Sequence, residues 1–543
     1  MKILGMIEGS HSSGIAYLQD GKPQFALEEE RHCRVKGHED FKNNFIRYPY
    51  HASQATPKLK EFDWKEIDYI TSSCPATDKS KYGSCIKDCW EDLGLGPFPH
   101  EKFIKVDHHE AHCHLAYYCS GFSEPTLVIS LDGGGEEYYA KYYLGQDGDL
   151  EYIDGTHIHQ KSLGQYYCML TEFLGWKRLK DEGKVVGLSS HGKYVDWIYN
   201  AFNNCIKIDG HNTDDCDKHK QSKKIYDDFY KLFVEYNPRN DLGPHGYSKE
   251  DIAYNGQLVF EEKILKIIDS LKSKYPQVEK IALSGGVFAN VKLNKRINEL
   301  NWVKEVFITP SMDDNGLPLG CALTVHKKQN PEFKPFKLKD TFLGISADKV
   351  EYDPTQFMER PYNEEEIAYD LKDGKVIGWF NGRYEHGPRA LCNRSIIADP
   401  SIPGTYKKIN DRLQRNDNMP FAPVVIDKYA EEVFNCKKSK YTAEFMTMLY
   451  DTNDSWVPLI PAVVHPIDKT ARIQIVTKDN NPKFYSLINK FNDITNIPVL
   501  LNTSFNVHGE PIVCHPEEAF VHLSNNIVDK LVINNKTYIK NDK

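Results

Sequence analysis

The sequence predicts an α/β protein with more than one domain, and three observations support this prediction. The chain has 543 residues, which is too long for a single hydrophobic core. Hydrophobic residues make up 40% and charged residues 27% of it, as in ordinary globular proteins. Apolar runs that end in glycine turns recur through its first half. We therefore expect strands joined by turns and helices.

The first of these units begins at the N-terminus. "KILGMIEG" and "SGIAYLQDGKPQFALEEER" indicate strands, with a hairpin at Asp20-Gly21. "TLVISLDGGGEEYYAKYYL" repeats the design, with a buried strand over 126–131, a glycine turn and a further strand. Two such units suggest a duplicated nucleotide-binding core of the actin, sugar-kinase and heat-shock-ATPase type.

A third turn lies in "KIALSGGVFANVKLNKRI". A strand over 280–283 leads through Ser284-Gly285-Gly286 into a helix that we expect from about residue 288. Backbone amides at such turns and at helix N-termini can cradle phosphate. The alternative is that these glycines serve only the turns that any α/β protein needs.

A change of composition marks the predicted domain boundary. Residues 326–344, "HKKQNPEFKPFKLKDTFLG", are charged and carry prolines, as linkers do. We expect one domain over 1–345 and a second over 346–543. In the second, Arg383, Arg389 and Arg394 crowd one loop-rich stretch, and guanidinium groups placed this way suit phosphate or carboxylate. Surface ion pairs are the alternative role.

Charge and cysteine content narrow the function classes. A net charge of −9 argues against a broad nonspecific grip on nucleic-acid backbone. No apolar stretch is long enough for a membrane span, and "MKILGMIEGSHSSG" lacks the apolar core of a secretory signal. Thirteen cysteines without a C-x-x-C pair fit reduced thiols. We expect a cytoplasmic protein that does not act at a membrane.

The stretch "VDHHEAHCHLA", residues 106–116, is rich in histidine. His108 and His112 are four residues apart, so in a helix they share one face. Two imidazoles placed this way can hold one cation, as in helical zinc motifs. A solvated helix surface is the alternative.

Together, ten motifs resemble the O-carbamoyltransferases of nodulation-factor and antibiotic biosynthesis along nearly the whole chain. They are "HSSGIAYLQDG", "DHHEAH", "SLDGGGE", "SLGQYY", "DEGKVVGL", "LSGGVFAN", "DDNGLPLGCA", "GRYEHGPRALCNRS", "PFAP" and "LLNTSFNVHGEPIV". The resemblance implies an actin-like (ASKHA) N-terminal domain, similar to the universal tRNA threonylcarbamoyl-transferase, and a YrdC-like C-terminal domain. In such enzymes the C-terminal site makes carbamoyladenylate from carbamoyl phosphate and ATP with Mg²⁺, releasing pyrophosphate. A substrate hydroxyl then attacks the carbamoyl group in the N-terminal site.

The resemblance also assigns residues of the N-terminal site. It implies that iron, as Fe²⁺, binds His108, His112, Asp132 and Asp314, and that Asp132 also acts in catalysis. Asp313 is the alternative to Asp314, but the Asn-Gly that follows Asp314 matches the family pattern better. Two imidazoles and two carboxylates suit a divalent first-row metal. His11 matches the family's candidate base, although Ser12 stands where an Asp often follows. The expected nucleotide contacts are Gly133, Gly134, Gly285, Gly286 and Asn290. Arg34 and Lys36 are candidates for holding donor or acceptor, with solvated surface charges as the alternative.

In the C-terminal site, the contacts expected for ATP and carbamoyl phosphate are Arg389, Arg415, Arg472, Ser504 and Asn506. This chain departs from the family pattern nearby, because Gln414 and Met419 replace a usual Lys and Arg. Cys392 and Lys469 each stand where glycine is usual. We expect Arg415 or Lys469 to supply the missing charge.

Three other functions are alternatives to this one. Threonylcarbamoyl transfer to tRNA would use a free-standing N-terminal domain and a basic surface, and the second domain and the negative net charge count against it. Hydrogenase-maturation chemistry would bring an acylphosphatase module and paired C-x-x-C zinc sites, which this sequence lacks. A non-catalytic actin-like scaffold is kept open by the altered "LQRNDNM" segment. The expected acceptor is a hydroxyl of a sugar, a natural product or a hydroxymethylated nucleotide in DNA. Residues 195–250 are either an acceptor pocket or a variable insertion, and a homodimer is a further expectation.

Overall fold

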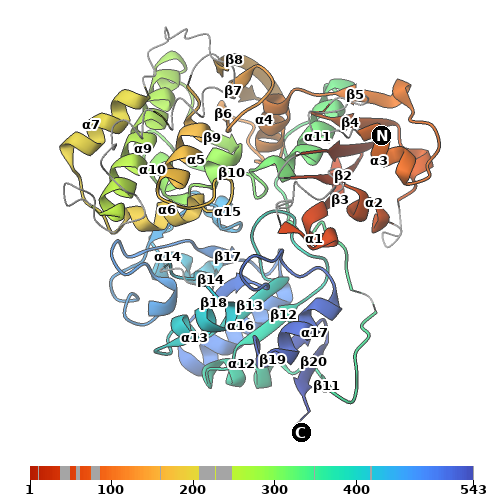
Figure 1. Ribbon diagram of the computed structural model, residues 1–543, viewed down its shortest axis with the longest axis vertical. Helices are drawn as coiled ribbons and strands as arrows, with labels where there is room; N and C mark the ends of the chain where they lie inside the picture. The colour runs from red at the N-terminus through yellow and green to blue at the C-terminus, as the bar shows by residue number, and fades with distance from the viewer. Residues whose placement is uncertain are drawn as a thin grey trace. The chain divides into compact units, whose positions relative to one another are not determined.

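A computed structural model describes ten ranges of the chain. They are 1–9, 12–36, 49–56, 62–74, 86–158, 161–206, 227, 248–347, 349–415 and 419–541. These residues form two compact units. Unit 1 contains Met1–Val106, Asp314–Pro331 and Leu338–Lys543, and unit 2 contains Asp107–Asp313 and Glu332–Lys337. Each unit mixes helices with strands (Figure 1), so the predicted α/β class is confirmed.

Unit 1 carries a five-stranded sheet in the order β3-β2-β1-β4-β5. Its strands are β1 (Lys2–Ile7), β2 (Gly14–Gln19), β3 (Lys22–Glu28), β4 (Tyr69–Ser72) and β5 (Phe103–Lys105). The first three are antiparallel, whereas β4 and β5 run parallel to β1. The predicted hairpin is confirmed, since Asp20 and Gly21 turn with φ of 48° and 78°.

The described helices that accompany this sheet are α1 (Glu29–Cys33), α2 (Tyr50–Gln54), α3 (Ile86–Asp92) and α11 (Leu317–Gln329). The helix α11 lies against β1 so closely that a Cβ on Gly5 would sit 1.8 Å from the carbonyl oxygen of Pro318. Only glycine fits there. This contact fixes the start of α11 on the sheet.

Unit 2 carries a second five-stranded sheet in the order β10-β9-β6-β7-β8. Its strands are β6 (Thr126–Leu131), β7 (Tyr138–Gln146), β8 (Asp149–His157), β9 (Lys280–Ser284) and β10 (Glu305–Ile308). Read from β8, this sheet has the same sequence of antiparallel and parallel neighbours as the first. The strands predicted over 126–131 and 280–283 are confirmed.

Among its described residues, unit 2 contains the helices α4 (His108–Tyr118), α5 (Leu163–Phe173), α6 (Glu182–Ser189), α7 (Asp196–Cys205), α9 (Lys249–Lys274) and α10 (Val291–Asn298). The helix expected from about residue 288 begins at Val291, because Gly286–Ala289 first form a short 3-10 turn. Within 195–250, residues 207–226 and 228–247 lie outside the described ranges. The choice between pocket and insertion stays a prediction.

Unit 1 also contains an eight-stranded mixed sheet in the order β11-β20-β19-β12-β13-β18-β14-β17. Its strands are β11 (Phe357–Pro361), β12 (Ile377–Phe380), β13 (Arg394–Ala398), β14 (Ala422–Ile426), β17 (Gln474–Val476), β18 (Val499–Ser504), β19 (Lys530–Ile533) and β20 (Lys536–Lys540). The accompanying elements are α12 (Glu364–Lys372), α13 (Thr405–Leu413), α14 (Ala430–Val433), α15 (Lys440–Ala443), α16 (Pro482–Thr495), α17 (Pro516–Ser524) and the pair β15 (Tyr450–Asp451) and β16 (Thr470–Ala471). Apolar side chains of α12 and α16 share a buried core with those of the sheet.

The predicted linker is partly helical. Residues 326–329 form the last turn of α11, where His326, Lys327 and Lys328 complement the negative end of the helix dipole. Residues 330–344 form no helix or extended strand. The domain boundary at 345–346 stays a prediction. In the described part of the chain, no helix combines the length and apolar character needed to cross a membrane.

Candidate metal centre and anion site

The histidine-rich stretch forms the helix α4, as predicted. Asp107 caps its N-terminus and accepts a hydrogen bond from the backbone amide of Glu110 at 2.9 Å. The helix therefore begins at His108, and His108 and His112 lie one turn apart with ring centroids 4.9 Å from each other. The sequence pattern correctly placed both imidazoles on one helical face.

Asp132, directly after β6, faces these two imidazoles. Its Oδ2 lies 3.9 Å from Nε2 of His108 and 3.5 Å from Nε2 of His112. Burial alone raises the pKa of Asp132, but hydrogen bonding and charge from both histidines hold that pKa well below its usual range. The carboxylate is therefore ionised and presented to two nitrogen ligands.

Further polar groups fix the orientation of this triad. Nδ1 of the fully buried His112 lies 3.0 Å from Oγ of Ser284, which also accepts a hydrogen bond from Thr309 at 3.2 Å. In the tautomer that donates from Nδ1, Nε2 presents its lone pair towards Asp132. The carboxylate of Asp132 accepts hydrogen bonds from the backbone amides of Gly133 and, at 3.1 Å, Gly286. Sequence reasoning missed the contacts of Ser284 and Thr309 with this site, although Ser284 is the first residue of the predicted glycine turn.

The neighbouring His109 has a different role. Its Nδ1 lies 2.7 Å from Oγ of Ser130 and its Nε2 lies 2.8 Å from the carbonyl oxygen of Tyr138. Burial, followed by the charges of His108 and His112, lowers its pKa to about 3. His109 is therefore a neutral, structural histidine between α4 and the sheet.

The triad fits a divalent metal. Metal–ligand bonds of about 2.0–2.2 Å place neighbouring ligand atoms about 3–4 Å apart. The ligand atoms of His108, His112 and Asp132 lie within 4.8 Å of one another, and two of their separations fall in that range. Asp314 follows Asp313, the last residue of the main segment of unit 2, and begins a segment of unit 1. Its role as fourth ligand stays a prediction.

The predicted glycine contacts lie beside this triad. Gly285 has φ of 103°, and a Cβ there would sit 2.1 Å from the carbonyl oxygen of Leu131, so only glycine is accommodated. Gly133 and Gly134 lie in the turn between β6 and β7. Asn290 caps α10, since its side-chain oxygen accepts a hydrogen bond from the backbone amide of Leu293 at 3.1 Å. Nucleotide contacts by these residues stay predictions.

Three predicted arginines lie close together in unit 1. Burial, followed by the charges of Arg389 and Arg415, holds the pKa of Arg472 well below its usual range. Arg415 also donates to Oγ1 of Thr503 and Oγ of Ser504, both at 3.2 Å. Mutual repulsion between guanidinium groups is relieved when an anion binds among them. This cluster therefore suits a polyphosphate.

Other candidate ligand-binding residues of unit 1 form hydrogen bonds with the protein backbone. Arg383 donates to the carbonyl oxygens of Gln24, Leu343 and Gly344, so the alternative of a structural arginine applies to it. The fully buried Arg394 likewise donates to the carbonyl oxygens of Asn381 and Gly382, both at 3.0 Å. The side-chain amide of Asn506 donates to the carbonyl oxygens of Val507 and Glu510 and closes a turn.

Cys392 and Lys469, which stand where the family usually has glycine, adopt a left-handed backbone conformation that favours glycine. Cys392 has φ of 75° and Lys469 has φ of 56°. The ammonium of Lys469 lies 3.0 Å from Asp454, and both side chains are more than half exposed. Lys469 is therefore poorly suited to replace the missing family charge, whereas Arg415 lies in the arginine cluster.

The remaining predicted residues lie near the N-terminus. Arg34 donates to the carbonyl oxygens of Pro511 and Ile512 at 2.9 and 2.8 Å, which ties α1 to that segment. Lys36 is exposed. His11 lies outside the described residues. Their proposed roles in binding and catalysis stay predictions.

Comparison with known proteins assigns the family. Residues 97–323 match the family described as Carbamoyltransferase N-terminus, and residues 368–540 match Carbamoyltransferase C-terminus. An uncharacterized protein of Methanocaldococcus jannaschii is 31% identical over 98% of each chain. Nodulation protein NolNO of Sinorhizobium fredii is 29% identical, with 96% of this chain and 78% of that protein covered.

A relative with a stated activity is the 3'-hydroxymethylcephem-O-carbamoyltransferase of Amycolatopsis lactamdurans, 27% identical over 67% of this chain and 66% of that protein. Among solved structures, full-length HypF in its phosphate- and nucleotide-bound form is 14% identical, covers 61% of this chain and 56% of its own, and has a TM-score of 0.34. That structural similarity is too weak to bear on fold or function. The two family matches and the relatives show that this chain is an enzyme of the O-carbamoyltransferase family.

Proposed function

We propose that this enzyme makes carbamoyladenylate from carbamoyl phosphate and ATP, and then transfers the carbamoyl group to a hydroxyl of its acceptor. The observation that carries the proposal is the triad of His108, His112 and Asp132, with the ionised carboxylate 3.5–3.9 Å from both imidazoles. That arrangement is suited to a divalent metal beside an acyl-phosphate donor.

The first half-reaction is assigned to the arginine cluster of unit 1. Carbamoyl phosphate is hydrolysed to carbamate and phosphate, and a carbamate oxygen then attacks the α-phosphorus of ATP as pyrophosphate leaves. Arg389, Arg415 and Arg472 offset the charge that builds up on the departing pyrophosphate, and Ser504 offers a hydroxyl to a phosphate oxygen. Mg²⁺ accompanies the ATP. We assign this part of the chain to a YrdC-like domain.

The second half-reaction is assigned to the triad. Here the acceptor hydroxyl attacks the carbamoyl carbon, the bond to the AMP oxygen breaks, and the hydroxyl proton passes to a base, for which we propose His11. Fe²⁺, held by the triad with Asp314, would neutralise the phosphate of AMP as it leaves. The shared strand order of the two five-stranded sheets supports an actin-like duplication over residues 1–345.

The triad does not determine which hydroxyl compound accepts the carbamoyl group. We propose a hydroxyl on a sugar, a natural product or a hydroxymethylated nucleotide. The name of the Amycolatopsis relative states a hydroxymethyl group on a cephem, which supports a primary alcohol as acceptor.

Two variants separate the half-reactions. With carbamoyl phosphate, ATP and a panel of alcohols, Arg472→Ala should lose pyrophosphate formation, whereas His112→Ala should keep it and lose the carbamoylated product. The matched control is His114→Ala on the same helix, because Nδ1 of His114 lies 2.8 Å from the carbonyl oxygen of Glu110 and this histidine is outside the triad. Full product formation by His112→Ala would refute the role of the triad.

A further inference from the structure

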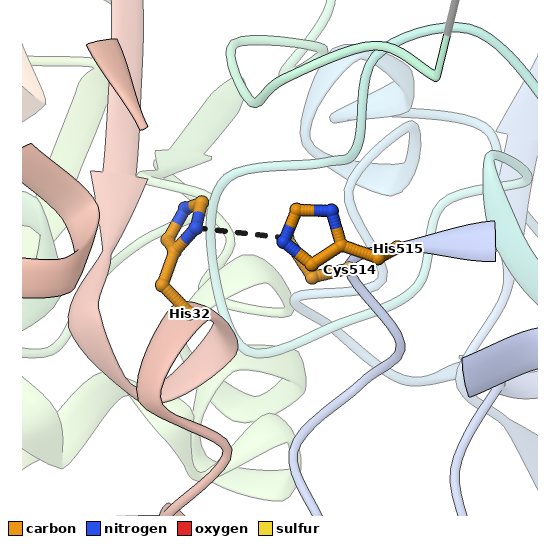
Figure 2. Close-up of side chains that lie close together, drawn as sticks. All are labelled: His32, Cys514 and His515. Atoms are coloured by element: carbon orange, nitrogen blue, oxygen red, sulfur yellow. Dashed lines mark hydrogen bonds between the residues drawn. The ribbon is translucent and has the colours of Figure 1, made fainter. Parts of the chain in front are cut away.

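A second group of metal-ligand side chains lies in unit 1. His32 is on α1, while Cys514 and His515 directly precede α17, 482 residues further along the chain. Figure 2 shows the ring of His32 on one segment and that of His515 on another facing each other, with Cys514 next to His515. Histidine and cysteine are the side chains that zinc prefers in structural sites.

The ligand atoms lie close enough together for a tetrahedral zinc site to form after small shifts. Nδ1 of His32 lies 3.9 Å from Sγ of Cys514, and one ligand atom from each of the three residues lies within 4.8 Å of the others. Zinc–sulfur bonds of about 2.3 Å and zinc–nitrogen bonds of about 2.0–2.1 Å put neighbouring nitrogen and sulfur ligands about 3.5 Å apart. Shifts of a few tenths of an ångström would bring Sγ of Cys514 and Nδ1 of His32 to that distance.

The imidazole of His32 is held in place by a group outside the cluster. Its Nε2 lies 2.9 Å from the hydroxyl of Tyr384, a fully buried side chain. When Nε2 donates that hydrogen bond, the lone pair of Nδ1 is directed towards Cys514. Ligating histidines are commonly oriented in this way through their other nitrogen.

The segment that carries Cys514 is also anchored. Its backbone amide donates to Oε2 of Glu518 at 2.6 Å. The same carboxylate oxygen lies 3.2 Å from the guanidinium of Arg34, which also donates to the carbonyl oxygens of Pro511 and Ile512. Contacts within the protein thus already hold the two segments that carry the cluster, so metal binding would cost little conformational entropy.

Burial and ligand chemistry identify the metal class. Cys514 is only 1% exposed, whereas His32 and His515 are partly exposed and leave a route for an ion. A thiolate with two imidazoles favours zinc over the harder cations that carboxylates select. The triad around Asp132 contains no sulfur, so the two sites differ in the metal they favour.

We propose that His32, Cys514 and His515 bind a zinc ion that fastens α1 to the segment before α17. Zinc replaces the thiol proton of Cys514, and the protein supplies three of the four ligands. Because an ion that binds only the folded chain stabilises it, binding raises the midpoint of thermal unfolding.

Cobalt(II) tests this site without any assay of activity. Chelator-treated full-length protein is titrated with Co²⁺, and absorption from sulfur-to-cobalt charge transfer is recorded. We expect that band to saturate with added Co²⁺, at one equivalent in the double variant His108→Ala, His112→Ala, to vanish in Cys514→Ser and His515→Ala, and to be bleached by Zn²⁺. The matched control is Cys33→Ser, next to His32 on α1, which should keep the band.

The double variant His108→Ala, His112→Ala should also keep the band, which separates this site from the proposed function. Circular dichroism checks that each variant is folded, and His515→Ala, at a partly exposed position, provides the test if Cys514→Ser does not fold. Absence of the band from the folded wild-type protein, or its persistence in a folded Cys514→Ser or His515→Ala variant, would overturn the proposal.

Discussion

The hydrogen bond between Ser284 and His112 gives a sharp test of the metal centre. Removing the hydroxyl with Ser284→Ala leaves Nδ1 of His112 without the partner that lies 3.0 Å away in the folded protein. Partners that orient a ligating imidazole typically contribute 10- to 100-fold to metal affinity, or about 1.4–2.7 kcal/mol. We expect a loss of that size.

The chain offers a closely matched control. Ser130 pairs with Ser284 in register across β6 and β9, is equally buried, and bonds His109 at 2.7 Å. Because His109 is outside the triad, Ser130→Ala should leave metal affinity unchanged. Ser284→Ala deletes two buried hydrogen bonds, to His112 and Thr309, and Ser130→Ala deletes one, so they should lower the free energy of unfolding of the metal-free protein by about 2 and about 1 kcal/mol, respectively.

Both quantities are measurable on the same samples. Metal affinity comes from competition between the protein and a chelator of known strength, and stability comes from urea unfolding. An equal loss of metal affinity in the two variants would refute the reasoning, as would an unchanged affinity in Ser284→Ala accompanied by the expected loss of stability.

Three other predictions concern unit 1. Arg472→Met should raise the midpoint of thermal unfolding and weaken pyrophosphate binding in calorimetry, since it relieves repulsion from Arg389 and Arg415. Burial lowers the pKa of Lys483 to about 8, so between about pH 8 and pH 10.5 the unfolded chain holds a proton that the folded chain has released. The free energy of unfolding should therefore rise with pH over this range, as measured by urea unfolding, and Lys483→Met should flatten the rise. Lys469→Gly should increase the free energy of unfolding by about 1 kcal/mol by relieving the left-handed backbone, whereas Lys469→Ala should not.

The sequence predicted local features well because they depend on near neighbours. The spacing of His108 and His112 sufficed to place them on one helical face, and Asp20-Gly21 sufficed for the hairpin. The partnership with Asp132 came from family resemblance, because no local rule joins a helix to the end of a later strand. Ser284 was missed since its contact with His112 spans 172 residues.

The arginines show why composition alone cannot assign a ligand. Arg383, Arg389 and Arg394 lie in one stretch, yet two of them donate to carbonyl oxygens of the chain. Which guanidinium meets a carbonyl depends on how distant loops pack. His32 and Cys514 illustrate the same limit, because a separation of 482 residues leaves no pattern for spacing rules to detect.

Asp132 connects the predicted metal centre to the predicted phosphate loop. A carboxylate offers about four lone-pair positions, and here the amides of Gly133 and Gly286 take two of them while Oδ2 also faces the imidazoles. The glycine turn expected to cradle an anion thus already has one amide turned to a carboxylate of its own chain. If Asp132 ligates a cation, its oxygen accepts less strongly from Gly286, and that amide becomes available to a phosphate oxygen. Metal and nucleotide binding at this loop should therefore favour each other, and to the same extent in both directions.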